Sequence, residues 1–202
     1  SNALLAGVGA ALRSLCGVRV VCTLQSELHF VDGLPQPQRD QVWEQMSAAL
    51  QQLDGVAAVS AYCKEQMMAR CGLSSDAVVV IPNGLDIDGY ASPDTAPDDP
   101  PVLGYLARLS EEKGALVALE SYENLRQRPG LAGLCLRMGG SVAPGGQALV
   151  DRLREATSDN PDARIVTNLS TEEKVEFLRG MSVFCVPGRL HEVAALYVIE
   201  AL

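Results

Sequence analysis

The chain alternates short runs of β-branched and apolar residues with longer segments of helical periodicity, and this alternation restricts its fold more than any other feature. Such a pattern is typical of βα units, whose strands form a parallel sheet covered by helices. The predicted strands are Arg19–Thr23, Val56–Ser60, Ala77–Ile81, Val102–Leu106, Leu134–Met138, Arg164–Thr167 and Val183–Val186. The predicted helices are Gln38–Leu53, Ala61–Cys71, Lys113–Arg126, Gln147–Ala156, Thr171–Gly180 and Ala194–Leu202, with one more before the first strand. The residues Ser170-Thr171-Glu172-Glu173 are a capping signal for the start of one of them. The sequence therefore predicts an α/β fold.

A proline-rich segment divides this pattern into two parts. The ten residues from Ser92 to Pro101 contain four prolines and three aspartates, a composition that neither pairs into a sheet nor buries apolar surface. We interpret residues 93–101 as a linker between a domain at residues 1–92 and a domain at residues 102–202. Residues 1–3 are interpreted as the remnant of an expression tag. We expect the N-terminal domain to be partial and the C-terminal domain to be nearly complete.

Composition and charge exclude several classes of protein. With 202 residues, of which 48% are hydrophobic and 20% charged, the chain can bury a core, so disorder and a small disulfide scaffold are excluded. The net charge of −9 disfavours nucleic acid and anionic membranes as partners, so an anionic ligand needs a local basic cluster. Six cysteines without Cys-x-x-Cys spacing are interpreted as buried thiols in a reducing compartment. We expect a cytoplasmic protein, and leave peripheral membrane attachment open for the full-length form.

The first candidate site follows the strand predicted at Val102–Leu106, where a short loop carries Arg108 and Lys113 before the next helix. In an open α/β sheet, ligands bind beyond the carboxyl ends of the strands, and the free N–H groups of a helix start favour anions. A planar guanidinium and an ammonium suit a diphosphate. An ordinary loop whose charges pair with Glu111 and Glu112 explains the same pattern, and the sequence leaves both interpretations open.

A second candidate site has two glutamates, Glu192 and Glu200, eight residues apart across a strand-to-helix junction. Glu200 is flanked by apolar residues, where an unpaired carboxylate is costly. If the segment were helical throughout, the pair would lie about 12 Å apart but off one face of the helix, which places Glu192 in the preceding loop. The alternative is a Glu200 that faces solvent and a Glu192 that caps the helix.

A glycine-rich loop, Gly139–Gly146, follows the strand predicted at Leu134–Met138 and contains four glycines. Such a backbone can wrap around a phosphate or a sugar. It lacks the Walker and Rossmann fingerprints, so a plain connection is favoured, and Gly139 is the single candidate that we take from it for substrate binding.

In order and spacing, a series of short motifs resembles the retaining family-4 glycosyltransferases, or group 1 glycosyl transferases, of the GT-B fold. The matching segments are Val20–Leu24, Val59–Ser60, Ile81–Asp86, Gly104–Gly114 and Ser170–Lys174, followed by Glu192 and Glu200. The resemblance implies two Rossmann-like parallel-sheet domains, the second of which binds a donor. It also implies a fragment that lacks the early N-terminal units and the extreme C-terminus.

The resemblance further implies a hexosyltransferase-like activity that moves a sugar from a nucleoside-diphosphate sugar to an acceptor hydroxyl with retention of configuration. Arg108 and Lys113 would neutralise the diphosphate and act as electrostatic catalysts. Glu192 would contact the donor sugar near its anomeric centre, and Glu200 would accept hydrogen bonds from the ribose hydroxyls. No metal ion or other cofactor is expected, and the acceptor could be a saccharide, a lipid-linked molecule or a small molecule. The chain alone is expected to be inactive and to self-associate through its incomplete N-terminal domain.

The chain departs from the family pattern at one important place. Val193-Ala194-Ala195 stands where the family has Gly-aromatic-Gly, and the added β-carbons put phosphate contact by that backbone in doubt. The alternative functions are a phosphorylase or epimerase on the same fold, or a non-catalytic nucleotide-binding α/β module.

Overall fold

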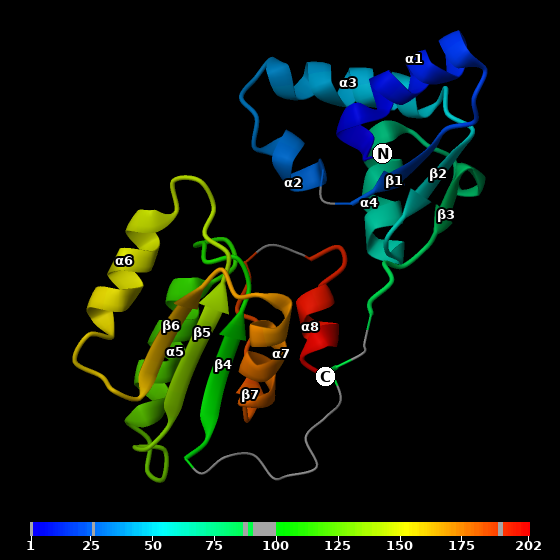
Figure 1. Cartoon of the computed structure of the whole chain (residues 1–202). Coiled ribbons are helices and arrows are strands. Elements are labelled where there is room, and N and C mark those ends of the chain that lie inside the picture. Colours follow the sequence, from blue (N-terminus) through cyan, green and yellow to red (C-terminus); the bar gives the residue numbers. More distant parts are fainter. Residues whose placement is uncertain (1, 26, 87–88, 91–99, 190–191) are drawn as a thin grey trace. The chain divides into compact units, whose positions relative to one another are not determined.

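The computed structural model describes residues 2–25, 27–86, 89–90, 100–189 and 192–202 (Figure 1). Contacts divide the chain into unit 1, which comprises Ser1–Leu85 and Glu192–Ala195, and unit 2, which comprises Asp86–His191 and Leu196–Leu202. Of the predicted linker at residues 93–101, all but Pro100 and Pro101 lie outside the described residues.

Unit 1 has a three-stranded parallel sheet with the strand order β1-β2-β3. Its elements are η1 (Ala3–Leu5), α1 (Ala6–Cys16), β1 (Val21–Leu24), α2 (Glu27–Asp32), α3 (Gln38–Leu50), β2 (Gly55–Ala58), α4 (Ala61–Cys71), η2 (Ser75–Ala77) and β3 (Val78–Val80). Cys22 of β1 pairs with Val56 of β2, which pairs in turn with Val78 of β3. All three side chains are buried, so this row lies on the core face of the sheet.

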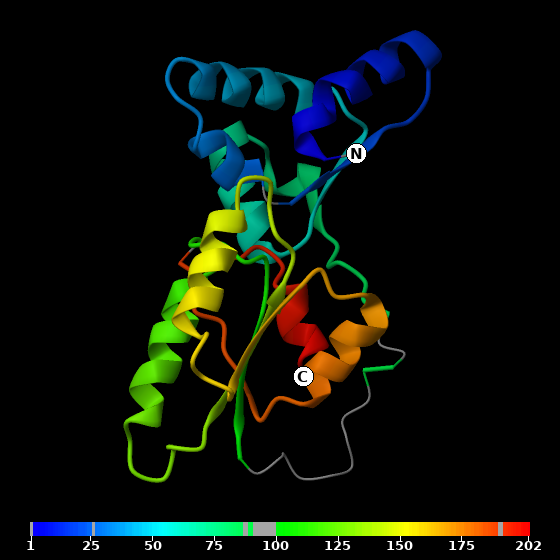
Figure 2. The same ribbon diagram turned by 60° about the vertical axis from the view of Figure 1, so that its left-hand side comes forward.

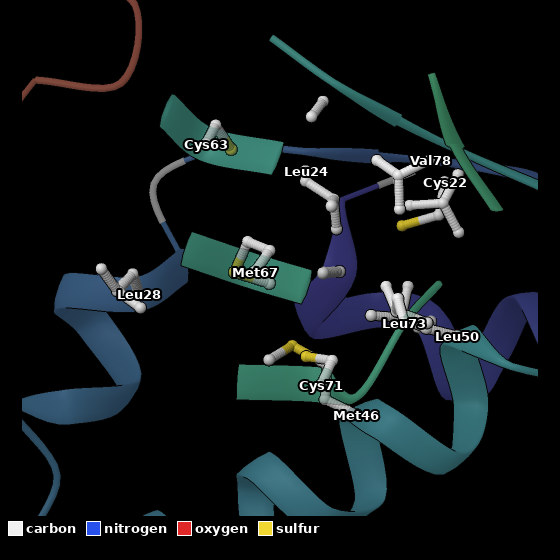
Figure 3. Packing of buried hydrophobic residues seen from close by; sticks show 14 of the residues in the cluster. Cys22, Leu24, Leu28, Met46, Leu50, Cys63, Met67, Cys71, Leu73 and Val78 are labelled. Atoms are coloured by element: carbon white, nitrogen blue, oxygen red, sulfur yellow. The ribbon is translucent and has the colours of Figure 1, made fainter. Parts of the chain in front are cut away.

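Helices α3 and α4 supply most of the remaining core of unit 1 (Figure 3). Met46 and Leu50 from α3 pack in one cluster with Met67 and Cys71 from α4. The rows on either side of it face the other way, and there Val21 of one row and Val79 of the other are exposed. One face of this sheet therefore carries the core, while apolar side chains of the other face are open.

Three details of unit 1 differ from the sequence-based expectation. Cys16 is exposed, so the prediction that the cysteines are buried is wrong for this residue, because it ends α1 away from Ala6 and Gly9, the buried positions of that helix. The prediction holds for Cys22, Cys63 and Cys71, whereas Cys135 and Cys185 of unit 2 are only partly buried. Helix α3 ends at Leu50, because the N–H groups of Gln52 and Leu53 bond to carbonyls three residues earlier, the tighter turn that closes helices. Helix α2 was not predicted.

Contacts between residues distant in sequence fix α2. Its first residue, Glu27, is buried and accepts hydrogen bonds from the N–H groups of Ala3, at 3.0 Å, and Gln25, at 2.6 Å. Asn2 also bridges to Thr23 of β1. Residues 2 and 3, interpreted from the sequence as part of a tag, thus take part in the packing of unit 1.

Unit 2 has a four-stranded parallel sheet with the strand order β6-β5-β4-β7. Its elements are β4 (Val102–Leu106), α5 (Ala115–Arg126), β5 (Cys135–Gly140), α6 (Gln147–Ala156), β6 (Ala163–Thr167), α7 (Thr171–Arg179), β7 (Val183–Phe184) and α8 (Leu196–Glu200). Helices α5 and α6 cover one face of the sheet, and α7 and α8 lie on the other (Figure 2). This is the doubly wound arrangement.

The predicted strands are all present, with ends shifted by at most two residues. The prediction of an α/β fold with parallel sheets is thus confirmed. In α7, the capping box predicted at Ser170 is formed: its hydroxyl accepts from the Glu173 N–H at 3.2 Å, and the Glu173 carboxylate accepts from the Ser170 N–H at 2.8 Å.

The helix predicted at Ala194–Leu202 is shorter, because Val193 and Ala194 pack against the core of unit 1 and residues 192–195 are grouped with that unit. Within the described residues, no helix is both long enough and apolar enough to cross a bilayer.

Candidate functional site

The strand order of unit 2 reverses at β4. From β4 the chain proceeds to β5 and β6 on one side, and then returns to place β7 on the other side. In doubly wound sheets, ligands bind at this reversal, in the crevice beyond the carboxyl ends of the strands. A ligand site is therefore expected at the segments that follow β4 and β7. Arg108 and Lys113 lie on the segment after β4.

Tyr105, the residue before the last in β4, fixes the loop that carries the two cations. Its side chain is buried, and its hydroxyl lies 3.2 Å from the carbonyl oxygens of both Arg108 and Lys113. One buried hydroxyl thus joins the start and the end of the loop. In the sequence, nothing distinguishes Tyr105 from an ordinary apolar strand residue.

The same loop is paired with two neighbouring segments. The N–H groups of Ala107 and Leu109 donate to the carbonyls of Gly139 and Ser141, at 3.2 and 3.0 Å. On the other side, the N–H of Arg189 donates to the carbonyl of Glu112 at 3.0 Å. The ends of β4, β5 and β7 therefore meet around Arg108, and the Arg189 backbone, which the sequence did not single out, joins them.

Glycines permit the close approach of these segments. Gly114 has φ +77°, and a β-carbon there would collide with the carbonyl oxygen of Pro187. This left-handed residue also explains why α5 begins at Ala115 and not at the predicted Lys113. At Gly140, a β-carbon would collide with the carbonyl oxygen of Ala107.

The side chain of Arg108 is exposed and has no hydrogen bond or ion pair within the described part of the chain. The alternative interpretation paired the loop cations with Glu111 and Glu112. Glu111 instead lies 3.7 Å from the guanidinium of Arg152, which belongs to α6. The guanidinium of Arg108 thus keeps its hydrogen-bonding capacity for a ligand.

The Lys113 ammonium lies 5.7 Å from the centre of the Tyr197 ring, within the range of a cation–π contact. Tyr197, on α8, also makes an edge contact with Phe184 of β7, with 6.3 Å between ring centres. Helix α8 is thereby held against the loop that carries Lys113.

Glu200, at the end of α8, is largely shielded from solvent and does not project freely into it. Its Oε1 atom lies 2.7 Å from the Lys174 ammonium, and the exposed fractions of the two side chains are 13% and 26%. The alternative of a solvent-facing Glu200 is thus wrong, because the ion pair turns the carboxylate toward α7.

The structure also positions the other two candidates from the sequence. A β-carbon on Gly139 would approach the Phe177 ring to 2.8 Å and Leu169 to 3.1 Å, so packing under α7 requires a glycine there whether or not a ligand binds. Glu192 belongs to the segment grouped with unit 1. Arg108, Lys113 and Glu200 thus all belong to unit 2, where Lys113 contacts Tyr197 of the helix that ends at Glu200, while the role of Glu192 stays a prediction.

Unit 2 is thus a doubly wound α/β domain with Arg108 and Lys113 in the loop that follows β4 at its reversal point, the place where domains of this class bind their ligands. The family model described as glycosyl transferases group 1 matches residues 89–202, and the model of glycosyltransferase family 4 matches residues 1–88. Because the first of these covers more than half of the chain, the chain belongs to the group 1 glycosyl transferases.

Solved structures support the same fold. HepE of Anabaena, solved in complex with UDP, is 18% identical with a TM-score of 0.74 over 98% of this chain and 55% of its own. Sucrose-phosphate synthase of Thermosynechococcus elongatus is 22% identical with a TM-score of 0.74, and the match covers 99% of this chain and 52% of the synthase. Starch synthase IV of Arabidopsis thaliana, bound to ADP and acarbose, is 17% identical with a TM-score of 0.63, and the match covers 98% of this chain and 52% of that chain.

The chain thus spans about half the length of the solved structures that it matches. Its fold is GT-B, with two Rossmann-like units. No curated protein is similar enough to the chain to count as a match.

Proposed function

We propose that unit 2 binds the nucleoside-diphosphate part of an activated sugar, and that the whole protein transfers this sugar to an acceptor hydroxyl with retention of configuration and without a metal ion. The observation that carries the proposal is the exposed Arg108, which has no partner among the described residues and lies on a loop fixed at the reversal point of the sheet. The neighbouring Lys113 adds a second positive charge.

These residues suit the charge that develops during such a transfer. As the bond between the anomeric carbon and the diphosphate breaks, its electron pair leaves on the diphosphate oxygen. Arg108 and Lys113 would stabilise this growing charge from fixed positions. Glu200 would accept hydrogen bonds from the ribose hydroxyls, and Glu192 would contact the sugar near its anomeric centre.

Two of the similar structures hold ligands that support this assignment: HepE was solved with UDP, and starch synthase IV with ADP. Both ligands are nucleoside diphosphates. They support the choice of this ligand class for the present chain, and the cations at the reversal point give it a physical basis.

Calorimetric titration with UDP, GDP and ADP, and with the matching nucleosides, tests the proposal. Substitution Arg108→Ala or Lys113→Ala should weaken nucleoside diphosphate binding by about 10- to 100-fold, because charge-assisted hydrogen bonds contribute about 1.5–3 kcal/mol each. Binding of the nucleosides, which lack phosphate, should be nearly unchanged.

Arg152→Ala is the matched control, because Arg152 is an exposed arginine of α6 whose partner, Glu111, is not among the residues assigned to the diphosphate. All titrations are done at the same ionic strength, since salt screens charged contacts. Diphosphate affinities of the Arg108 and Lys113 variants within a factor of two of the parent would show that these residues form an ordinary loop.

The absence of a metal requirement is tested separately by adding a chelator to the same titrations. We expect the nucleoside diphosphate affinity to stay constant, because the two cations supply the positive charge. A loss of affinity that added Mg²⁺ restores would overturn this part of the proposal.

A further inference from the structure

We propose that Lys174 is a positioning residue for the donor: it holds the Glu200 carboxylate by one oxygen, leaves the other oxygen for the ribose hydroxyls, and cancels the negative charge of Glu200 beside the diphosphate. This inference rests on the proposed function of unit 2. It assigns a role to a residue of α7 for which the sequence indicated none.

The geometry of the pair is specific. The Lys174 ammonium lies 2.7 Å from Oε1 of Glu200, and both side chains are largely shielded. No donor among the described residues reaches Oε2. A carboxylate offers about four lone-pair positions, so the ammonium occupies one side of Glu200 and leaves acceptors for two neighbouring hydroxyls.

A third group keeps Lys174 in place and charged. The Tyr90 ring centre lies 5.5 Å from the Lys174 ammonium. Burial acts to lower the pKa of Lys174, but the Glu200 carboxylate and the Tyr90 hydroxyl, through their interactions with the ammonium, outweigh it, so the pKa lies above its ordinary value. Lys174 therefore stays protonated throughout the neutral range and places a positive charge beside the carboxylate of Glu200.

Charge balance matters because the ligand is an anion. An unpaired Glu200 near a diphosphate would repel it, and such repulsion is strong where water is partly excluded. A shielded ion pair adds little net stability, because the cost of removing two charges from water offsets their attraction. The pair is thus better explained by the orientation of Glu200 than by folding stability.

Arg179 on the same helix offers a matched control. Its guanidinium donates to the Gly89 carbonyl at 2.8 Å and pairs with Glu176 at 2.7 Å. Both cations of α7 therefore contact the same neighbouring segment, Arg179 at Gly89 and Lys174 at Tyr90. Among the residues that the structure describes, however, no contact joins Arg179 to Glu200.

The experiment is a double-variant cycle with Lys174→Met and Glu200→Gln. The probes are UDP, GDP or ADP, whichever the parent binds most tightly, and the corresponding 2′-deoxynucleoside diphosphate. We expect the parent to prefer the ribose form, and Lys174→Met to lose about tenfold in affinity for it together with most of that preference. The double variant should match Glu200→Gln alone, because Lys174 acts only through Glu200.

Two further variants separate positioning from folding. Lys174→Arg should restore most of the preference for ribose, and Arg179→Met should leave it unchanged. Lys174→Gln replaces Lys174→Met if thermal unfolding shows that the methionine variant is not folded. A Lys174 variant that keeps the parental preference for ribose, or losses that add in the double variant, would overturn the inference.

The cycle also distinguishes this inference from the proposed function. If the parent binds no nucleoside diphosphate, the proposed function fails, and the inference falls with it. If the parent binds and Glu200→Gln weakens the ribose preference while Lys174→Met does not, the inference alone is wrong.

Discussion

At the scale of the single residue, the hydroxyl of Tyr105 holds the loop that carries the cations Arg108 and Lys113. Arg108 and Lys113 are visible in the sequence, but their separation in space depends on a hydroxyl that reaches the carbonyls at both ends of the loop. Gly114 completes the arrangement, because only a glycine tolerates both its positive φ and the adjacent Pro187 carbonyl. The site thus depends on two residues that carry no charge.

Tyr105→Phe should therefore lower both stability and nucleotide affinity. Loss of the buried hydroxyl removes a hydrogen bond and leaves two carbonyls without it, which costs about 1–3 kcal/mol in the free energy of unfolding. Nucleoside diphosphate affinity should fall several-fold, because Arg108 and Lys113 lose their common anchor. Thermal unfolding and calorimetry measure the two effects.

Tyr122→Phe is the control for this variant, because Tyr122 is also buried and its hydroxyl accepts from Asn160, a residue outside the loop that carries Arg108 and Lys113. It should lose stability without losing nucleotide affinity. Equal affinity losses in both variants would mean that Tyr105 acts on the fold of unit 2 as a whole.

Helix α7 links folding to the candidate site at the scale of the element. It begins at a complete capping box around Ser170 and carries Lys174 in its first turns. It also packs over Gly139 through Phe177. A short helix of nine residues has little stability of its own, so its cap and its packing together keep Lys174 opposite Glu200.

Ser170→Ala should destabilise unit 2 by about 1 kcal/mol at neutral pH, the usual cost of losing an N-cap side chain. The pKa of Glu172 is lowered by its backbone contact and by Ser170. A lowered pKa in the folded state stabilises the protein above the ordinary glutamate pKa of 4.5, and this contribution is lost as the pH falls below it. The effect of Ser170→Ala should therefore shrink in acid.

Ser60→Ala is the matched control, because the Ser60 hydroxyl caps α4 in unit 1 by accepting from the Cys63 N–H at 3.0 Å. It should cost a similar amount without changing nucleotide affinity. Chemical denaturation at neutral and acid pH checks both variants, and a Ser170→Ala effect that grows in acid would contradict the prediction.

At the scale of the whole molecule, the sheet of unit 1 exposes apolar side chains to solvent. Val21, Val79 and Ile81 have exposed fractions of 57, 59 and 58%, and they line a cavity of about 660 Å³ on the open face. Strand β3 also lies at an edge of the sheet. Exposed apolar faces and free strand edges promote association.

We therefore predict that the chain self-associates, and that Val79→Thr combined with Ile81→Thr weakens the association by removing apolar surface while keeping β-branched side chains. Sedimentation velocity over a wide concentration range measures it. Val183→Thr is the control, because Val183 is equally exposed, at 61%, but belongs to β7 of unit 2. A compact monomer at every concentration would show that the open face does not drive association.

The sequence by itself determined the features that depend on neighbouring residues. Alternating periodicity located the strands, the Ser170 to Glu173 spacing predicted the cap, and the loop after β4 revealed Arg108 and Lys113. These are local properties, because the period of a segment and the chemistry of a cap involve residues only a few positions apart.

Only the tertiary structure decided which distant residues meet. Lys174 pairs with Glu200 across 26 positions, and Glu27, the first residue of α2, accepts a hydrogen bond from Ala3, 24 positions earlier. Cys16 is exposed although its neighbours are apolar, because burial depends on what packs against a helix rather than on the helix itself. Such contacts arise when helices and strands pack, so local patterns contain no record of them.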